Sequence, residues 1–231
     1  MKRPEKHLAV IPARAGSKGL IGKNMRYLDG YPLLTYTLDA AIDAAFFDRI
    51  VITTDMEDMI DYVGGYADDK VMTLRRPKRL CGDKVPLAPV IVHALQETEA
   101  AYMENYTDIW TLQVTSPLRT DEDIIKAHRV YKESGADSLT SVTEEHHAIF
   151  KKERGFTKRV HKPGKTRQTT EPYYVGNGAI FITKKGVLLG YKDRLGITPA
   201  LYVMDKVSSI DIHTQEDLEL AEYYLNRRHE E

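Results

Sequence analysis

A stretch of glycines and cations follows the first apolar segment of the chain. Between Ala13 and Leu28 the sequence has no acidic residue, and four cations alternate there with three glycines: Arg14, Lys18, Lys23 and Arg26, and Gly16, Gly19 and Gly22. Glycine lets the backbone approach a ligand closely, and main-chain N–H groups together with Lys and Arg side chains bind phosphate oxygens. This loop therefore predicts a site for a polyphosphate.

The spacing of the loop differs from two common nucleotide-binding motifs. A P-loop requires G-x-x-x-x-G-K-[ST], but five residues separate Gly16 from Gly22, and Asn24 stands where Ser or Thr would bind magnesium. The G-x-G-x-x-G fingerprint of dinucleotide sites does not occur in the chain. The loop is then either a phosphate site of another type or a basic surface loop without a ligand.

The elements that would position this loop alternate between strands and helices. Short apolar runs predict strands at 8–11, 50–54, 71–74, 108–114, 138–143, 178–183 and 202–204. Helical spacing predicts helices over 32–45, 56–66 and 86–104, and from the capping-box residues Thr120 and Thr214 onward. This pattern is typical of an α/β, Rossmann-like fold, with a mostly parallel central sheet covered by helices on both faces. Ligands of such sheets bind at the carboxyl ends of the strands, where the basic loop is expected.

One segment interrupts the alternation. Residues 144–176 are polar and basic, and we expect them to be irregular; within them, residues 151–167 hold eight Lys or Arg and one acid, Glu153. A run of charge is usually a solvated surface, and the alternative is that it contributes to an active site. We predict one domain over 1–231, in which 144–176 form an inserted arm.

Composition excludes several classes of protein. The 231 residues include 33 Lys or Arg and 34 Asp or Glu, so the formal net charge of −1 argues against a protein that coats nucleic acid. A hydrophobic fraction of 42% is enough for a core. No apolar run approaches the roughly 20 residues that span a bilayer, and the N-terminus does not resemble a signal peptide. A single cysteine, Cys81, excludes an internal disulfide. We expect a soluble, cytoplasmic protein with no nucleic-acid or membrane partner.

Five ordered motifs resemble those of the acylneuraminate cytidylyltransferases, which include the CMP-sialic-acid synthetases and their relatives for legionaminic and pseudaminic acids. The motifs are the loop from Ile11 to Asn24, Arg76-Pro77, Leu112 to Arg119, Asn177 to Ile180, and Ser209 to Asp211. They span roughly residues 8–225. The resemblance implies a nucleotidyltransferase-type fold with a dimerisation arm at 144–176. It also implies transfer of a cytidylyl group from CTP to a nonulosonic sugar acid, with Mg²⁺ as cofactor and a homodimer as the assembly.

The resemblance also implies roles for individual residues. The nucleotide-binding set is Arg14, Gly16, Ser17, Lys18, Lys23, Asn24 and Arg76. Within it, Arg14 and Lys18 would act in catalysis by holding the triphosphate, and Arg76 would contact the cytidine. The set that binds the sugar acid is Gln113, Lys151, Arg167, Tyr174 and Asn177. Two residues in these motifs have structural alternatives: Gln113 as a buried amide that caps backbone groups, and Arg119 as a brace for its loop.

The sequence departs from the family pattern at two places. The family commonly has Asp-x-Asp as magnesium ligands where this chain has Asp211-Ile212-His213. Alternation keeps both side chains on one face, but Mg²⁺ prefers oxygen ligands. Asp211 and His213 are the predicted metal residues, with Asp211 also catalytic, and Mn²⁺ is an alternative ion. The second departure is Leu87, which cannot give the hydroxyl hydrogen bond that sialic-acid enzymes tend to have near the nucleotide.

These departures leave three hypotheses. The first is a CTP-dependent cytidylyltransferase for a sialic-acid-like sugar. The second keeps the fold but changes the substrates, to another sugar acid such as Kdo or to another nucleotide. The third, motivated by His213, is a catalytically weak module that binds nucleotide sugars.

Overall fold

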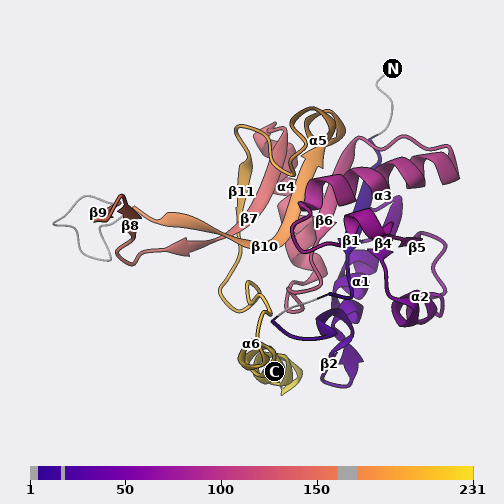
Figure 1. Cartoon of the computed structure of the whole chain (residues 1–231), viewed down its shortest axis with the longest axis horizontal. Coiled ribbons are helices and arrows are strands. Elements are labelled where there is room, and N and C mark those ends of the chain that lie inside the picture. The colour runs from indigo at the N-terminus through magenta and orange to yellow at the C-terminus, as the bar shows by residue number, and fades with distance from the viewer. Residues whose placement is uncertain (1–4, 17–18, 161–170, 231) are drawn as a thin grey trace.

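A seven-stranded sheet forms the centre of the computed structural model, which describes residues 5–16, 19–160 and 171–230 (Figure 1). The strand order is β11-β7-β10-β6-β1-β4-β5, and within this sheet β10 alone is antiparallel to its neighbours. In that order the bounds are Ala200–Val203, Ser138–Glu145, Tyr173–Lys184, Asp108–Leu112, His7–Pro12, Arg49–Thr54 and Val71–Arg75. The predicted mostly parallel α/β sheet is confirmed.

Helices cover both faces of the sheet. On one face α1 (Leu33–Asp43), α2 (Glu57–Val63) and α4 (Asp121–Ser134) enclose the larger apolar core. On the other face α3 (Leu87–Tyr102) and α5 (Lys185–Tyr191) enclose a smaller one. Strand β1 lies between these two cores, because its alternate side chains enter them in turn. This explains why its sequence is a continuous apolar run.

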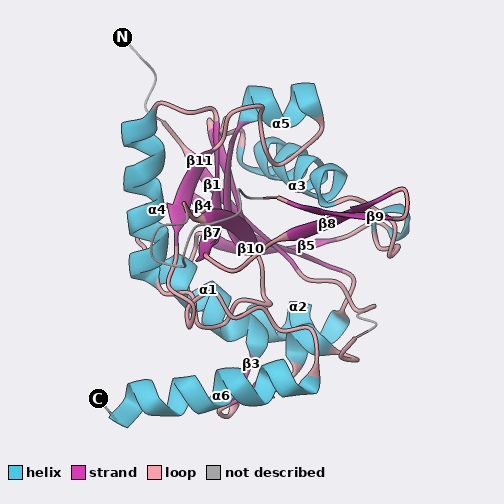
Figure 2. Ribbon diagram, turned by 90° about the vertical axis from the view of Figure 1, so that its left-hand side faces the viewer, coloured by secondary structure: helices cyan, strands magenta, loops and turns pink. Residues whose placement is uncertain are grey.

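The C-terminal helix α6 (Gln215–Glu230) extends along the lower edge of the molecule in Figure 2. Its buried face consists of Leu218, Ala221 and Leu225, as helical spacing predicts. The predicted capping box of α4 is present, with Thr120 and Asp123 each accepting a hydrogen bond from the other's main-chain N–H. The remaining short elements are η1 (Lys23–Met25), η2 (Lys78–Leu80) and the hairpin of β2 (Tyr27–Leu28) and β3 (Tyr31–Pro32).

The arm (residues 144–176) is regular in its described part, so the expectation of an irregular segment was wrong. Strands β7 and β10 continue beyond the sheet as a pair that reaches Glu145 and Tyr173. A separate hairpin of β8 (Phe150–Glu153) and β9 (Phe156–Arg159) lies at the far end (Figures 1 and 2). Hydrogen bonds between the strands satisfy the main-chain groups there, although the side chains are not buried. The segment can therefore form strands without an apolar sequence pattern.

Among the described helices, none has the length and apolar character needed to cross a membrane.

Candidate active site

A cavity of about 410 Å³ opens at the carboxyl ends of β1, β5 and β6. Arg76 and Gln113 directly follow β5 and β6, and the basic loop follows β1. The position agrees with the expectation for an open α/β sheet. Six of the predicted site residues line the cavity together: Arg14, Lys23, Asn24, Arg76, Gln113 and His213.

Arg14 is held on one side of the cavity by contacts from the loop before α3. Its Nη1 donates to the main-chain oxygen of Cys81 at 3.3 Å and to Oδ1 of Asp83 at 2.6 Å. The ion pair is about one-third exposed, so an incoming anion can compete with Asp83 for the guanidinium. Arg14 is therefore oriented within the chain by a main-chain oxygen and a carboxylate.

The basic loop is fastened to the segment that carries Asp211 and His213. Lys23 Nζ donates to the main-chain oxygen of Ile212 at 2.6 Å, and burial lowers the pKa of this ammonium. A Cβ at Gly19 would lie 2.5 Å from the main-chain oxygen of His213, so this contact requires glycine. Inside the loop, the buried Asn24 donates from Nδ2 to the main-chain oxygen of Arg14 at 2.9 Å. The loop that follows β1 and the segment that precedes α6 thus meet at the cavity.

Arg76 is a buried cation beneath the cavity. Its Nη2 donates to the main-chain oxygen of Thr53 at 2.7 Å, and its Nε lies 3.4 Å from the Thr53 hydroxyl. Burial lowers the pKa of this guanidinium. Arg76 lines the cavity, and within the described chain Nη1 is the guanidinium nitrogen without a hydrogen bond.

Asp211 and His213 lie side by side, as alternation predicts. His213 Nε2 is 2.9 Å from Asp211 Oδ2, while Asp211 Oδ1 is buried and has no hydrogen-bond partner in the described chain. Gly178, at φ +77°, brings the backbone of β10 against this pair and against Gln113, whose Nε2 would be 3.2 Å from a Cβ there. The unpaired carboxylate oxygen is a position that a cation can fill.

Arg119 has the structural role that we anticipated. It is fully buried, and its Nη1 donates to the main-chain oxygens of Gln113 and Ala179 at 3.2 and 3.0 Å. Burial lowers its pKa to about 10. It therefore joins the end of β6 to β10 beneath the site and does not enter the cavity.

Comparison with known proteins decides the family. The sequence profile described as Cytidylyltransferase matches residues 8–225. This chain is a member of the cytidylyltransferase family. The N-acylneuraminate cytidylyltransferase of Escherichia coli O18:K1:H7 is 33% identical over 94% of the chain, which spans only 51% of that relative's length. The CMP-N,N'-diacetyllegionaminic acid synthase of Campylobacter jejuni is 27% identical over 95% of the chain and 94% of its own length.

The fold of this cytidylyltransferase also matches a solved structure. A CMP:2-keto-3-deoxy-manno-octonic acid synthetase complexed with CTP superposes with a TM-score of 0.68 at 16% identity, over 97% of this chain and all of the other. At that identity the similarity establishes the nucleotidyltransferase fold alone.

Asn177 lies inside the cytidylyltransferase fold beside the cavity. Its Oδ1 accepts from the Ser141 hydroxyl at 2.6 Å and from the main chain of Ala179 at 3.2 Å. Its Nδ2 donates to the Ser209 hydroxyl at 2.9 Å. These bonds connect β7, β10 and the segment before Asp211, and a direct contact with the sugar stays a prediction.

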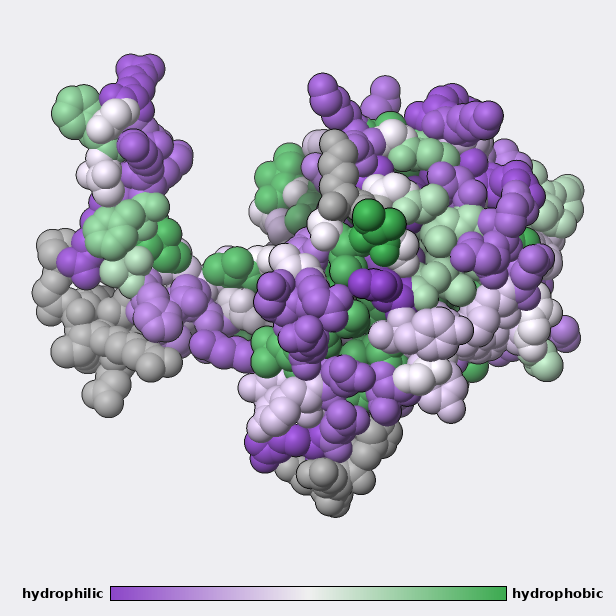
Figure 3. Space-filling model, turned by 60° about the horizontal axis from the view of Figure 1, so that its bottom comes forward, coloured by the Kyte–Doolittle hydropathy of each residue, from purple (hydrophilic) through white to green (hydrophobic). Residues whose placement is uncertain are grey.

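Two predicted sugar contacts lie on the arm, away from the cavity of the same chain. Lys151, on β8, pairs with Glu153 and is 67% exposed, and Tyr174, at the outer end of β10, is 46% exposed. Figure 3 shows the arm standing apart from the body, joined by a narrow neck. The structure does not bring Lys151 and Tyr174 to the residues that line the cavity.

Three predicted residues lie outside the described chain: Ser17, Lys18 and Arg167. Gly16 is among the described residues and is exposed. A Cβ at this position would lie 3.7 Å from Arg14 Nη1. The roles of these four residues stay predictions.

Sequence reasoning missed two acids that shape the site. Asp83 pairs with Arg14 from 69 residues away, and Asp55 accepts a hydrogen bond from the main-chain N–H of Ala15 at 2.8 Å. The position of Asp55 at the end of a predicted strand was a usable signal, because strand ends collect at the site. Asp83 lies in an irregular loop, where no periodic pattern marks it.

Proposed function

We propose that this cytidylyltransferase transfers CMP from CTP to the anomeric hydroxyl of a nonulosonic acid and releases pyrophosphate. The observation that carries the proposal is the convergence of Arg14, Lys23 and Arg76 on one cavity, which His213, beside Asp211, also lines. The names of the sialic-acid and legionaminic-acid relatives support the acceptor.

The reaction is an in-line substitution at the α-phosphorus. A bond forms between the anomeric oxygen and the α-phosphorus, the bond to the oxygen that bridges to the β-phosphorus breaks, and the proton of the hydroxyl is released. Such transfers depend on positioning and on charge stabilisation rather than on covalent chemistry by the protein. Arg14 and Lys23, together with Lys18, would stabilise the negative charge on the triphosphate as the bridging oxygen leaves.

The residues at 211–213 fit a divalent cation. Asp211 Oδ1 is a buried carboxylate oxygen without a hydrogen bond in the described chain, and Oδ2 lies 2.9 Å from His213 Nε2. Asp211 would be the ligand, with His213 beside it as a nitrogen ligand or as a hydrogen-bond partner of bound water. Mg²⁺ suits the carboxylate, and Mn²⁺ accepts imidazole more readily. When bound, the ion neutralises charge on the phosphates.

The nucleoside would lie between Arg76 and the loop before α3. Arg76 offers Nη1, while Leu80, Val85, Leu87 and Val90 give that wall of the cavity an apolar character. An apolar wall can pack against a base, so cytosine selection would depend on Arg76 and on main-chain groups. Packing of the base against this apolar wall would take the place of the hydrogen bond that Leu87 cannot make.

The arm supports a homodimer in which each copy completes the cavity of the other. It carries the exposed cation Lys151, and it exposes Phe150, Phe156 and Val160 at 60%, 80% and 45%. Apolar side chains exposed to this degree on a two-stranded hairpin are expected to pack against another surface. Lys151 and Tyr174 would then approach the sugar acid in the partner's cavity.

A substrate panel tests the activity. Pyrophosphate release is measured with each of the four nucleoside triphosphates, Mg²⁺ or Mn²⁺, and N-acetylneuraminic, legionaminic, pseudaminic and Kdo acids. We expect turnover with CTP and a nonulosonic acid. Turnover only with Kdo, or only with another nucleotide, would replace the substrate assignment, and CTP binding without turnover would support the weak binding module.

A subunit-mixing assay tests the shared site. Arg14→Ala and Lys151→Ala chains are purified separately, mixed, dissociated and reassembled. In a random mixture half of the dimers are mixed and each has one intact site, so activity should return to about a quarter of the wild-type level. No recovery above the two separate variants would mean that the arm serves its own chain.

A further inference from the structure

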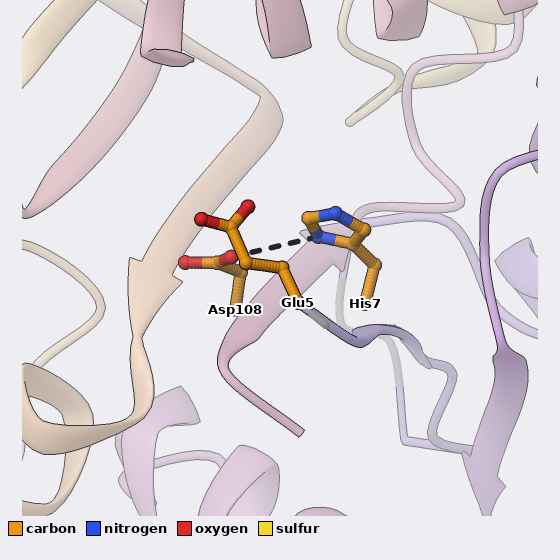
Figure 4. Close-up of side chains that lie close together, drawn as sticks. All are labelled: Glu5, His7 and Asp108. Carbon is orange, nitrogen blue, oxygen red and sulfur yellow. Dashed lines mark ion pairs between the residues drawn. The ribbon is translucent and has the colours of Figure 1, made fainter. Parts of the chain in front are cut away.

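A second group of metal-ligating side chains lies at the opposite end of the sheet from the cavity. Glu5, His7 and Asp108 each offer one ligand atom, and these atoms all lie within 4.8 Å of one another (Figure 4). His7 begins β1, while Pro12 at its other end lines the cavity. Five residue steps of a strand separate the two by about 16 Å, so this group is separate from Asp211 and His213.

His7 and Asp108 are buried, and the strand register places them together. They are paired residues of the adjacent parallel strands β1 and β6, with exposures of 7% and 4%. His7 Nδ1 is 3.6 Å from Asp108 Oδ2, but it makes no hydrogen bond in the described chain. Figure 4 shows the imidazole directed at both carboxylates. A buried ring nitrogen without a hydrogen bond is costly unless something binds it.

The carboxylates are held in place by neighbouring residues. Asp108 Oδ1 accepts from the Tyr131 hydroxyl at 2.7 Å, and Oδ2 accepts from the Thr107 hydroxyl at 3.1 Å. Glu5 Oε2 accepts from Lys132, which leaves Oε1 without a partner among the described residues. Hydrogen bonds that orient the ligands in this way are a regular feature of metal sites.

A second imidazole, that of His128, lies with its ring centre 4.9 Å from that of His7, and its Nε2 is buried without a hydrogen bond in the part of the chain described. Two buried imidazole nitrogens at this end of the sheet therefore lack a hydrogen bond within the described chain.

We propose that Glu5, His7 and Asp108 form a structural site for a divalent transition-metal ion, with Zn²⁺ as the best match. Zn²⁺ accepts both imidazole nitrogen and carboxylate oxygen as ligands, and water would complete its coordination by the three residues. Mg²⁺ is a poor match because it seldom accepts imidazole. The bound ion would join the start of β1 to the start of β6. The competing explanation is a direct ion pair between protonated His7 and Asp108, with no metal.

Calorimetric titration of the metal-free full-length protein with ZnSO4 tests this proposal. The starting variant carries Asp211→Asn and His213→Ala, so that the candidate catalytic site takes no ion. We expect one Zn²⁺ per chain, and we expect His7→Gln or Glu5→Gln to weaken binding at least tenfold. His93→Gln is the matched control, because His93 is a largely buried histidine on α3, away from this group. It should bind Zn²⁺ like the starting variant.

A second measurement does not require the replacement of His7. In the starting variant, Zn²⁺ should shift the ring ¹⁵N resonances of His7, and it should raise the melting temperature of this variant but not of the same variant with Glu5→Gln added. Glu5 is on the surface, so this variant tests the site even if His7→Gln does not fold. The proposal is overturned if Zn²⁺ leaves the His7 resonances unchanged, or if Glu5→Gln binds Zn²⁺ as the starting variant does. Neither readout involves cytidylyl transfer.

Discussion

The cavity and the arm both concentrate positive charge, but they hold it differently. In the cavity Arg14, Lys23 and Arg76 are each fixed by acceptors from distant parts of the chain: Asp83, Ile212 and Thr53. On the arm Lys151 pairs with Glu153 on its own strand and remains 67% exposed. The cations of the cavity are therefore fixed by their own chain, whereas Lys151 on the arm is open to further contacts from another molecule.

This difference separates two kinds of contribution to binding. A cation that is already oriented loses little side-chain entropy when a phosphate arrives, and it stabilises charge without reorganisation. An exposed cation beside exposed aromatic rings contributes when a surface covers it and excludes water. Substitutions in the two regions should therefore differ in what they change, as well as in how much.

The largest effect is expected for Arg14→Ala. Loss of one oriented charge at the triphosphate should lower kcat/KM by about 10²–10³-fold, because the stabilisation is greatest in the transition state. Pyrophosphate release measures the change. Arg26→Ala is the control: Arg26 lies in the same basic stretch but is exposed and bonds Gln215. Equal losses in the two variants would contradict a cavity organised around Arg14.

The next effect concerns Asp211→Asn, which removes the charge but keeps the shape. We expect an activity loss of about 100-fold and a higher Mg²⁺ requirement, because the amide is a weaker metal ligand. The activity is titrated against Mg²⁺ and Mn²⁺. If the variant shows the wild-type metal dependence, the metal is bound elsewhere.

On the arm, Phe156→Glu should dissociate the dimer and lower activity by about tenfold or more, because a charge replaces an apolar anchor at an interface. Light scattering gives the mass of the assembly. The melting temperature of the separated chain should not change, since Phe156 is 80% exposed. Phe156→Leu should remain dimeric, and a Phe156→Glu variant that stays dimeric would remove Phe156 from the interface.

A smaller effect on activity is expected for a substitution of Asn177, where β10 passes from the arm to the cavity. Asn177→Ala leaves Ser141 and Ser209 without their partner, and it should lower the free energy of unfolding by about 1–3 kcal/mol. Thermal unfolding measures this as a shift of about 2–4 °C for each kcal/mol. If stability is unchanged while the KM for the sugar rises, Asn177 acts as a direct substrate contact.

The smallest effect is expected for His213→Asp. It should lower the ratio of Mn²⁺ to Mg²⁺ activity by about tenfold or less, because an oxygen ligand replaces a nitrogen ligand. Parallel assays with the two ions give the ratio. An increase from no turnover to normal turnover would instead show that His213 makes the natural protein a binding module.

Most of the sheet could be predicted from the sequence, because its central strands β1, β4 and β6 are buried on both faces and have apolar sequences. Ile50 to Thr54 and Ser138 to Thr143 were predicted within two residues of their observed bounds. Helix α5 was not predicted, since it follows β10 directly, contains Gly186 and Gly190, and buries only Leu188. The hairpin of β8 and β9 is exposed throughout, so it has no apolar pattern to detect.

The site was predictable in its parts but not in its internal contacts. Strand ends and motifs identified Arg14, Arg76 and Gln113, which line one cavity. The partners that orient them are main-chain oxygens and an acid in a loop, and residue type gives no information about these. The pairing of Arg14 with Asp83 depends on how two loops fold over the sheet, so it required coordinates.

Strand β10 gives the molecule a mechanical connection between its two regions. Its twelve residues run without a break from the arm to the centre of the sheet, and they carry Gly178, which lies against Gln113 and Asp211. No loop separates the arm from the cavity, and the irregular pairing between Gly176 and Phe181 is the point at which the strand can yield. A partner that binds the arm would therefore act on the same strand that lies against Gln113 and Asp211.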